Sequence, residues 1–218
     1  MIPMKIIRGL ISIFATTLGG VAASSYGDTI ADLFNTGVDA SGVPLSSGVD
    51  PHYTVVSGPG GASTALAGNL SPGYWIGNDT LSQWTYASGS AYEAGYFDFQ
   101  TTFTLGAGSS TTASISGQFA TDNELSDVYL NGQALGISQL SDFYFTLWHP
   151  FSIATGSGFI DGLNTLDFVI HNDQGPSGLR VEMTGDTGTQ SVPDTASTFA
   201  MLGGAMIGLA VLRRRFAA

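Results

Sequence analysis

The 218-residue chain contains no cysteine, which excludes disulfide bonds and a cysteine nucleophile. Charged residues make up only 11% of the sequence, less than half of the roughly one quarter found in an average globular protein. Glycine, with 30 residues, is about twice as frequent as usual. Aromatic residues at 11% exclude a disordered acidic chain, which would lack them. The composition therefore predicts a folded, glycine-rich protein that is stabilised without disulfide bonds.

Lysine and arginine are scarce and lie almost entirely at the two ends of the chain. The sequence contains six of them, and only Arg180 lies within residues 26–190. The same stretch holds 16 aspartate and glutamate residues, which give it a formal net charge of −15. Binding to phosphates requires clustered lysine and arginine. Nucleic acid is therefore excluded as a partner of this stretch.

The N-terminal 25 residues have the order of a secretory signal peptide. Lys5 and Arg8 precede an apolar run at 10–18, and small residues follow at 19–25. The apolar residues form a continuous run rather than a helical stripe, which disfavours the alternative of an amphipathic first helix. We expect residues 1–25 to be a signal peptide with a cleavage site at Val21-Ala22-Ala23.

The C-terminal segment has the features of a membrane anchor. An apolar run at 196–212 is followed by Arg213, Arg214 and Arg215. Its length is at the short limit for a membrane-spanning helix, and the arginines should stay on the cytoplasmic side as a membrane stop. A buried core helix is the alternative, but such a helix is not usually apolar all round. The acidic middle is then expected on the outer side of the inner membrane.

The order of three features at the C-terminus resembles a known sorting signal. Val192-Pro193-Asp194-Thr195, the apolar span and the arginine cluster resemble a PEP-CTERM signal, and more closely its VPDSG-type variant. The resemblance implies that an exosortase-type transpeptidase recognises Val192, Pro193, Asp194 and Thr195, removes the helix and passes the protein to the cell surface or extracellular matrix, in company with exopolysaccharide production. Asp194-Thr195 replaces the Glu-Pro of the namesake motif. Pro193 favours an extended chain, which a processing enzyme can grip.

The middle of the chain predicts an all-β domain at 26–186, joined by a linker at 187–191 to the sorting signal at 192–218. Residues 95–105 alternate between apolar and polar side chains, and Asn131-Gly132 predicts a tight hairpin turn. Further strands are expected at 112–120, 143–147, 151–154, 165–171 and 179–184, with weaker ones at 53–57, 74–76 and 84–86. Nine or ten short antiparallel strands favour a β-sandwich of the jelly-roll type.

A second resemblance concerns the fold of this domain. The segments 119–123, 128–132, 162–168 and 178–182 resemble parts of a galactose-binding-like jelly roll. Sandwiches of that kind serve as carbohydrate-binding modules and as non-catalytic domains of glycosidases, and similar modules are common in PEP-CTERM proteins. The resemblance implies an interaction with extracellular polysaccharide.

Sugar binding would use exposed aromatic rings, because the apolar face of a pyranose stacks on them. Trp75, Trp84 and Trp148 are the candidates, with Tyr74, Tyr92 and Tyr144 behind them. The alternative for each ring is a place in the core, where large aromatic residues usually lie.

An acidic loop offers a candidate calcium site. Asp122, Asn123, Glu124 and Asp127 cluster in the sequence, and calcium prefers oxygen ligands. No EF-hand spacing is present, and a solvated acidic loop is the alternative. No other cofactor is expected.

Catalytic motifs are absent from the sequence. It has no strict Gly-x-Ser-x-Gly elbow, no His-Glu-x-x-His and no phosphate-binding loop with a lysine. We therefore expect a non-enzymatic surface or matrix protein that interacts with exopolysaccharide. A purely structural surface protein without a sugar site is one alternative. A glycan-active hydrolase is the other, because 16 acidic residues leave many possible carboxylate pairs.

Overall fold

The computed structural model describes residues 28–141 and 144–188, and its secondary structure confirms the expected all-β fold. The predicted signal peptide and sorting signal lie outside these residues. All strand pairs are antiparallel. The strands are β1 (Gly48–Ser57), β2 (Ser63–Ala67), β3 (Thr85–Ala87), β4 (Gly95–Leu105), β5 (Ser114–Asp122), β6 (Glu124–Leu130), β7 (Gln133–Ala134), β8 (His149–Ile153), β9 (Gly162–Asn172) and β10 (Gly178–Asp186).

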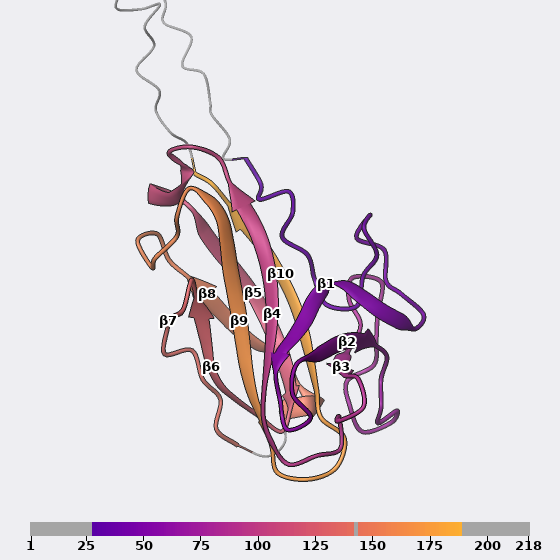
Figure 1. The fold of residues 1–218 in the computed structure, drawn as a ribbon. Helices are drawn as coiled ribbons and strands as arrows, with labels where there is room; N and C mark the ends of the chain where they lie inside the picture. The colour runs from indigo at the N-terminus through magenta and orange to yellow at the C-terminus, as the bar shows by residue number, and fades with distance from the viewer. Residues whose placement is uncertain (1–27, 142–143, 189–218) are drawn as a thin grey trace, which may run out of the picture.

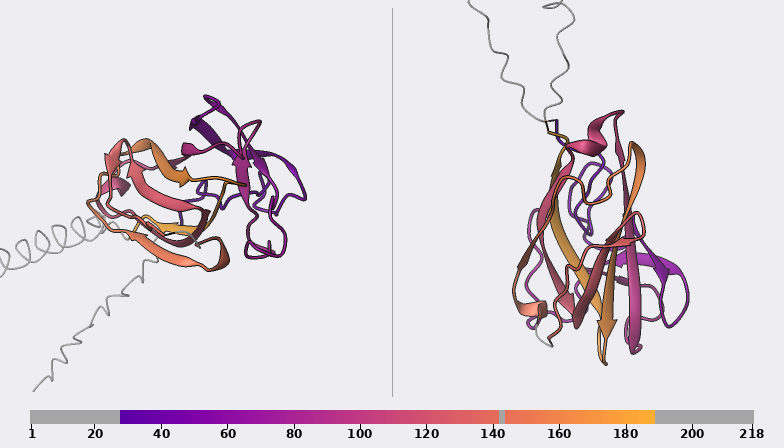
Figure 2. Two further views of the ribbon diagram at one scale, coloured as in Figure 1. Left: turned by 90° about the horizontal axis from the view of Figure 1, so that it is seen from below. Right: turned by 90° about the vertical axis from the view of Figure 1, so that its left-hand side faces the viewer.

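The strands form a sandwich of two layers (Figure 1). Hydrogen bonding connects them in the order β7-β6-β9-β4-β1-β2-β3-β10-β5-β8. One layer is built on β6, β9 and β4, the other on β10, β5 and β8, and the two views in Figure 2 show the layers facing each other. Phe151 on β8 meets Phe168 on β9 across the gap, with ring centroids 5.9 Å apart in an edge-to-face arrangement. The core therefore lies between the layers.

The alternation of side chains along β4 positions both the core and a polar outer face. Phe97, Phe99 and Phe103 are fully buried between the layers. Burying each such ring stabilises the fold by roughly 1.5–3 kcal/mol. Asp98 and Gln100, which lie between these rings in the sequence, point to the opposite face, because successive side chains of a strand alternate. The polar face of β4 becomes part of a groove described below.

The Asn-Gly turn between β6 and β7 is confirmed. Asn131 and Gly132 both have positive φ, 53° and 78°, as a type I′ hairpin turn requires. Two other expectations from the sequence are wrong: residues 144–146 form a short 3-10 helix rather than a strand, and 74–76 do not form a strand. Strand β2 was not expected from the sequence, because its Ser-Thr-Ala-Leu-Ala segment carries little strand signal.

A second, smaller core covers the outer face of β5 and β10 around Ala120 and Gly178. It consists of Trp75, Trp84 and Ala120, with Leu70, Ile76, Phe145 and Trp148 packed against them. Gly178 on β10 makes room for this cluster, because a Cβ atom there would lie 2.8 Å from the Trp75 ring. The loop that joins β2 to β3 is thereby packed onto the sandwich.

Candidate functional site

Two of the three tryptophans expected to stack on sugar are buried. Trp75 is 4% exposed and Trp84 is fully buried, with their ring centroids 4.3 Å apart. Both indole N–H groups donate inside the protein, Trp75 to Asp122 Oδ2 at 2.6 Å and Trp84 to the carbonyl oxygen of Ile76 at 2.9 Å. Trp75 and Trp84 therefore take the alternative place in a core, and their rings are not available for the sugar stacking considered for them.

Trp148 is half-buried and covers the guanidinium of Arg180, whose Cζ lies 4.7 Å from the ring centroid. Arg180 is fully buried on β10. Its Nε donates to Ser82 Oγ at 2.8 Å, and its Nη2 lies 2.9 Å from Asp79 Oδ2 and 3.4 Å from Glu182 Oε1. The face of Trp148 that turns to Arg180 is therefore not available for the predicted sugar stacking.

The structure does not assemble the predicted calcium ligands, which are Asp122, Asn123, Glu124 and Asp127. Asp122 accepts from an indole, Asn123 Oδ1 accepts from a backbone N–H, and Asp127 Oδ1 accepts from two backbone N–H groups. Glu124 lies 3.8 Å from His171. Across residues 28–141 and 144–188, no three histidine, cysteine, aspartate or glutamate side chains are grouped so that they could hold a metal ion.

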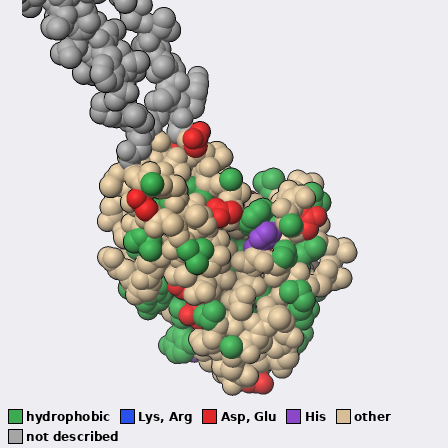
Figure 3. Space-filling view, turned by 45° about the horizontal axis from the view of Figure 1, so that its top comes forward, with side chains coloured by type: hydrophobic (Ala, Val, Ile, Leu, Met, Phe, Trp, Pro, Cys, Tyr) green, Lys and Arg blue, Asp and Glu red, His purple; other side chains and the backbone are tan. Residues whose placement is uncertain are grey.

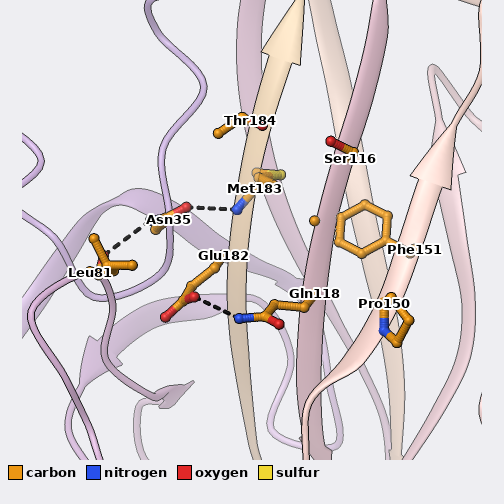
Figure 4. Close-up of a pocket in the computed structure, with 10 residues that line it drawn as sticks. Asn35, Leu81, Ser116, Gln118, Pro150, Phe151, Glu182, Met183 and Thr184 are labelled. Carbon is orange, nitrogen blue, oxygen red and sulfur yellow. Dashed lines mark hydrogen bonds between the residues drawn. The ribbon is translucent and has the colours of Figure 1, made fainter.

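A hollow of about 560 Å³ lies on the outer face of β5 and β10, and its amide and carboxylate side chains are already paired (Figure 4). Gln118 Nε2 donates to Glu182 Oε2 at 2.8 Å. Asn35 donates to the carbonyl oxygen of Leu81 at 3.1 Å and accepts from the backbone N–H of Met183 at 2.8 Å. Asn35 thereby joins two loop segments to β10, and these bonds occupy the amide and carboxylate groups of the hollow.

A hollow of about 380 Å³ lies beside β3 and the turn that precedes β4. We call it the tyrosine groove. Leu70, Tyr86, Ser90, Tyr92 and Glu93 line it. Tyr92 is 62% exposed, Tyr86 is half-buried and Glu93 is exposed. The groove therefore combines two aromatic rings with a carboxylate, which gives it both apolar surface and hydrogen-bonding groups. Among the residues that line the groove, Tyr92 was a candidate for sugar stacking from the sequence. The side chain of Tyr144, another such candidate, lies outside the described part of the chain.

Hydrogen bonds fix the turn that carries Tyr92. The backbone N–H of Glu93 donates to the carbonyl oxygen of Ser90 at 2.9 Å. The backbone N–H of Ser177 donates to the carbonyl oxygen of Ala91 at 2.7 Å. The buried side chain of Asn172 donates to the carbonyl oxygen of Glu93 at 2.9 Å. These bonds fix the backbone of the turn, so that its side chains are presented from a preorganised segment.

The tyrosine groove and the C-terminal end of the described chain lie at opposite ends of the sandwich. Tyr92 lies just before Gly95, where β4 begins, and β4 ends at Leu105. Thr112 follows that far end and donates its hydroxyl to the carbonyl oxygen of Thr187. Eleven residues of strand at about 3.3 Å each separate the two ends by about 35 Å. Both ends of the described chain leave from the top of Figure 1.

A third hollow, of about 470 Å³, lies on the outer face of β4, β9 and β6. We call it the carboxylate groove, and its lining includes Asp98, Gln100, Tyr129, Thr165 and Asp167. Strand register brings these together: Gln100 pairs with Asp167, which pairs with Tyr129. Gln100 Nε2 donates to Asp167 Oδ1 at 2.7 Å. The carboxylate pair was not among the residues singled out from the sequence.

Burial makes three carboxylates unusually easy to protonate. It raises the pKa of Asp98 from 3.8 to about 6, and the negative charge of Asp167 adds to this effect. Asp98 Oδ1 is buried without a hydrogen-bond partner. Burial also raises the pKa of Asp167, against the hydrogen bond from Gln100, and that of Asp122 to about 6, against the hydrogen bond from Trp75. Their ionised forms therefore destabilise the folded state.

Replacing Asp98 with asparagine is expected to raise the melting temperature by about 3 °C at pH 7.5 and to change it little at pH 4. The folded-state pKa of Asp98 lies above the unfolded value, so its contribution to stability is full below about pH 3.8 and is lost as the pH rises to about 6. After allowance for solvent screening, the loss is about 1 kcal/mol. Thermal melting across this range measures the effect.

Asp28→Asn removes the same charge from an exposed side chain and serves as the control. The raised pKa of Asp98 would be contradicted if Asp98→Asn raised the melting temperature equally at both pH values. It would also be contradicted if Asp28→Asn raised the melting temperature by the same amount as Asp98→Asn.

Comparison with known families confirms the C-terminal resemblance. Residues 191–216 match the VPDSG-CTERM motif. The chain therefore carries a sorting signal of the PEP-CTERM type, which marks an exported protein for the cell surface. Val192, Pro193, Asp194 and Thr195 lie inside the match but outside the described residues, as do Arg213, Arg214 and Arg215. No curated protein matches the chain.

The chain is similar to several solved structures. A CBM35 domain from Paenibacillus barcinonensis is 15% identical with a TM-score of 0.34, over 64% of this chain and 98% of that chain. A family 35 carbohydrate-binding module from Clostridium thermocellum is 19% identical with a TM-score of 0.31, over 54% and 86%. A cyclase from Fischerella sp. TAU is 10% identical with a TM-score of 0.40, over 72% and 98%. The sandwich described above rests on strand pairing and packing within this chain.

Within the described ranges 28–141 and 144–188, no helix is long and apolar enough to cross a membrane. The membrane span expected at 196–212 lies outside these ranges.

Proposed function

We propose that an exosortase-type transpeptidase sorts this exported protein to the cell surface or extracellular matrix, where its tyrosine groove binds a polysaccharide without cleaving it. The observation that carries the binding proposal is a groove between the exposed ring of Tyr92, on a turn fixed by hydrogen bonds, and the half-buried ring of Tyr86 on β3. The apolar C–H face of a pyranose can stack on the exposed ring of Tyr92, while its hydroxyl groups can donate to the carboxylate of Glu93.

The position of the groove supports this proposal. The sorting signal begins a few residues after the described C-terminal end, about 35 Å of strand away from the tyrosine groove. A sandwich held by that end would direct Tyr86 and Tyr92 away from the surface to which it is attached. A groove in this place stays accessible to a polymer in the surrounding matrix, both before and after removal of the membrane anchor.

The charge of the domain supports a neutral rather than an anionic ligand. Acidic side chains are spread over the face shown in Figure 3, and no lysine or arginine is visible among the described residues there. With a net charge of −15 for residues 26–190, the domain repels a polyanion such as a sulfated or uronic-acid polymer. Glu93 is the one carboxylate among the residues that line the groove, whereas glycoside hydrolysis usually employs two.

A glycan array tests this proposal. The full-length chain, kept in mild detergent, is expected to bind neutral glycans and to leave uronic-acid and sulfated glycans unbound. Incubation with the bound glycans is expected to release no new reducing ends. Failure to bind any neutral glycan would favour a purely structural surface protein, and steady release of reducing ends would favour a hydrolase.

A further inference from the structure

The carboxylate groove is separate from the tyrosine groove and presents hydrogen-bond acceptors. Asp167 is 7% exposed, and its Oδ1 already accepts from Gln100 Nε2 at 2.7 Å. This bond directs the amide NH₂ of Gln100 to Asp167 and leaves the amide oxygen as an acceptor. The hydroxyl groups of Tyr129 and Thr165 can also accept hydrogen bonds. A ligand that suits this groove must therefore supply donors.

No cation of the described chain neutralises the carboxylate pair. Arg180 is the only lysine or arginine within residues 28–141 and 144–188, and it lies on the other layer beside Asp79 and Glu182. His171, on the same face as Asp98 and Asp167, lies 3.5 Å from Asp173 and 3.8 Å from Glu124. Asp127, the other carboxylate of β6, accepts from backbone N–H groups. A cation that pairs with the ionised carboxylates would therefore come from outside this part of the chain.

We propose that the carboxylate groove binds a primary ammonium group carried on a sugar, as in an amino-sugar polymer that has lost its N-acetyl groups. An ammonium group has three donors and no acceptor, so it complements two carboxylates and a neighbouring hydroxyl or amide oxygen. Hydrogen bonds between an ammonium and a carboxylate are about twice as strong as neutral ones. The desolvated pair at Asp98 and Asp167 gains most from such a partner.

The dimensions and setting of the groove favour a sugar over an isolated amine. Its volume of about 470 Å³ exceeds what one ammonium group occupies, and Thr165 and Tyr129 extend the lining beyond the carboxylates. The hydroxyl groups of Thr165 and Tyr129 can form hydrogen bonds with the ring hydroxyls of the sugar unit that carries the ammonium group. The choice of a polysaccharide rather than a lysine-rich protein rests on the proposed function, because that function places the domain in a polysaccharide matrix.

Titration of the full-length chain with a glucosamine oligomer and with its N-acetylated counterpart tests the inference. At about pH 6.5 and about 150 mM salt, which screens long-range attraction, the free amine is expected to bind at least tenfold more tightly than the N-acetylated form. Asp167→Asn and Asp98→Asn are each expected to weaken amine binding at least tenfold. Asp28→Asn, which removes the same charge elsewhere, is expected to change it less than twofold.

Tyr92→Ala separates this inference from the proposed function, because it is expected to weaken binding of a neutral glycan and to leave amine binding unchanged. Asp98→Asn keeps the test valid if Asp167→Asn does not fold, since it is expected to stabilise the protein at neutral pH. Equal weakening by Asp28→Asn or equal affinity for the N-acetylated oligomer would overturn the inference. Tighter binding of a lysine oligomer of the same length would also overturn it, in favour of a basic protein partner.

Discussion

Replacing Arg180 with methionine is expected to lower the free energy of unfolding by about 3–5 kcal/mol. Methionine keeps much of the packing against Trp148 but removes every hydrogen bond that the Arg180 guanidinium makes to the loop at 77–82. It also leaves Glu182, whose side chain is 12% exposed, without its cation. Uncompensated burial of a charge is among the most destabilising changes in a protein.

Thermal melting and tryptophan fluorescence measure this effect. The melting temperature is expected to fall by about 10 °C, because 1 kcal/mol corresponds to roughly 2–4 °C in a domain of this size. Emission should shift to the red as Trp75 and Trp84 become exposed. Adding Glu182→Gln to Arg180→Met is expected to recover part of the loss, since it removes the unpaired carboxylate.

Asp79→Asn is the matched control for Arg180→Met. Its side chain is 45% exposed, so loss of its charge is expected to reduce stability by no more than about 1 kcal/mol. Arg180→Lys is expected to resemble Arg180→Met rather than wild type, because a single ammonium cannot replace the guanidinium fork. Wild-type stability of Arg180→Met would show that this cluster does not hold the loop to the sheet.

Replacing Pro193 and Asp194 with alanine is expected to abolish sorting, leaving the unprocessed protein in the membrane fraction. Both residues lie in the matched motif, directly before the apolar span at 196–212. Pro193 favours the extended backbone that a transpeptidase needs, and Asp194 supplies the charge of the motif. Fractionation of cells followed by immunoblotting separates the larger membrane-bound form from the processed surface form.

The double variant Thr189→Ala and Gln190→Ala alters two polar residues just outside the match and is expected to be processed normally. Normal release of the Pro193 and Asp194 variant would refute the role of the motif. This result would not affect the binding proposals, which concern residues of the sandwich.

Local sequence patterns predicted much of the fold. The alternation along 95–105 gave β4 its bounds and its buried face, and Asn131-Gly132 predicted the hairpin between β6 and β7. These signals work because strand periodicity and turn chemistry act over a few residues. The sorting signal could also be predicted, since its motif, apolar span and arginine cluster follow each other directly along the chain.

The candidate sites could not be predicted in the same way, because they depend on contacts between distant residues. Trp75 and Trp84 are buried because the loop that contains them packs on β10, where Arg180 lies about a hundred positions away. Gln100 and Asp167 are 67 positions apart and meet only through the pairing of β4 with β9. Composition alone does not distinguish an aromatic ring in such a core from one on the surface.

Binding of a neutral glycan by the Tyr92→Ala variant decides whether the tyrosine groove is the polysaccharide site. The full-length chain and this variant are titrated with the neutral glycan that binds best on the array. The account predicts that affinity falls at least tenfold, or about 1.4 kcal/mol. Tyr74→Ala, which removes a 75% exposed ring that does not line the groove, is predicted to change it less than twofold. Unchanged affinity of Tyr92→Ala would contradict the account.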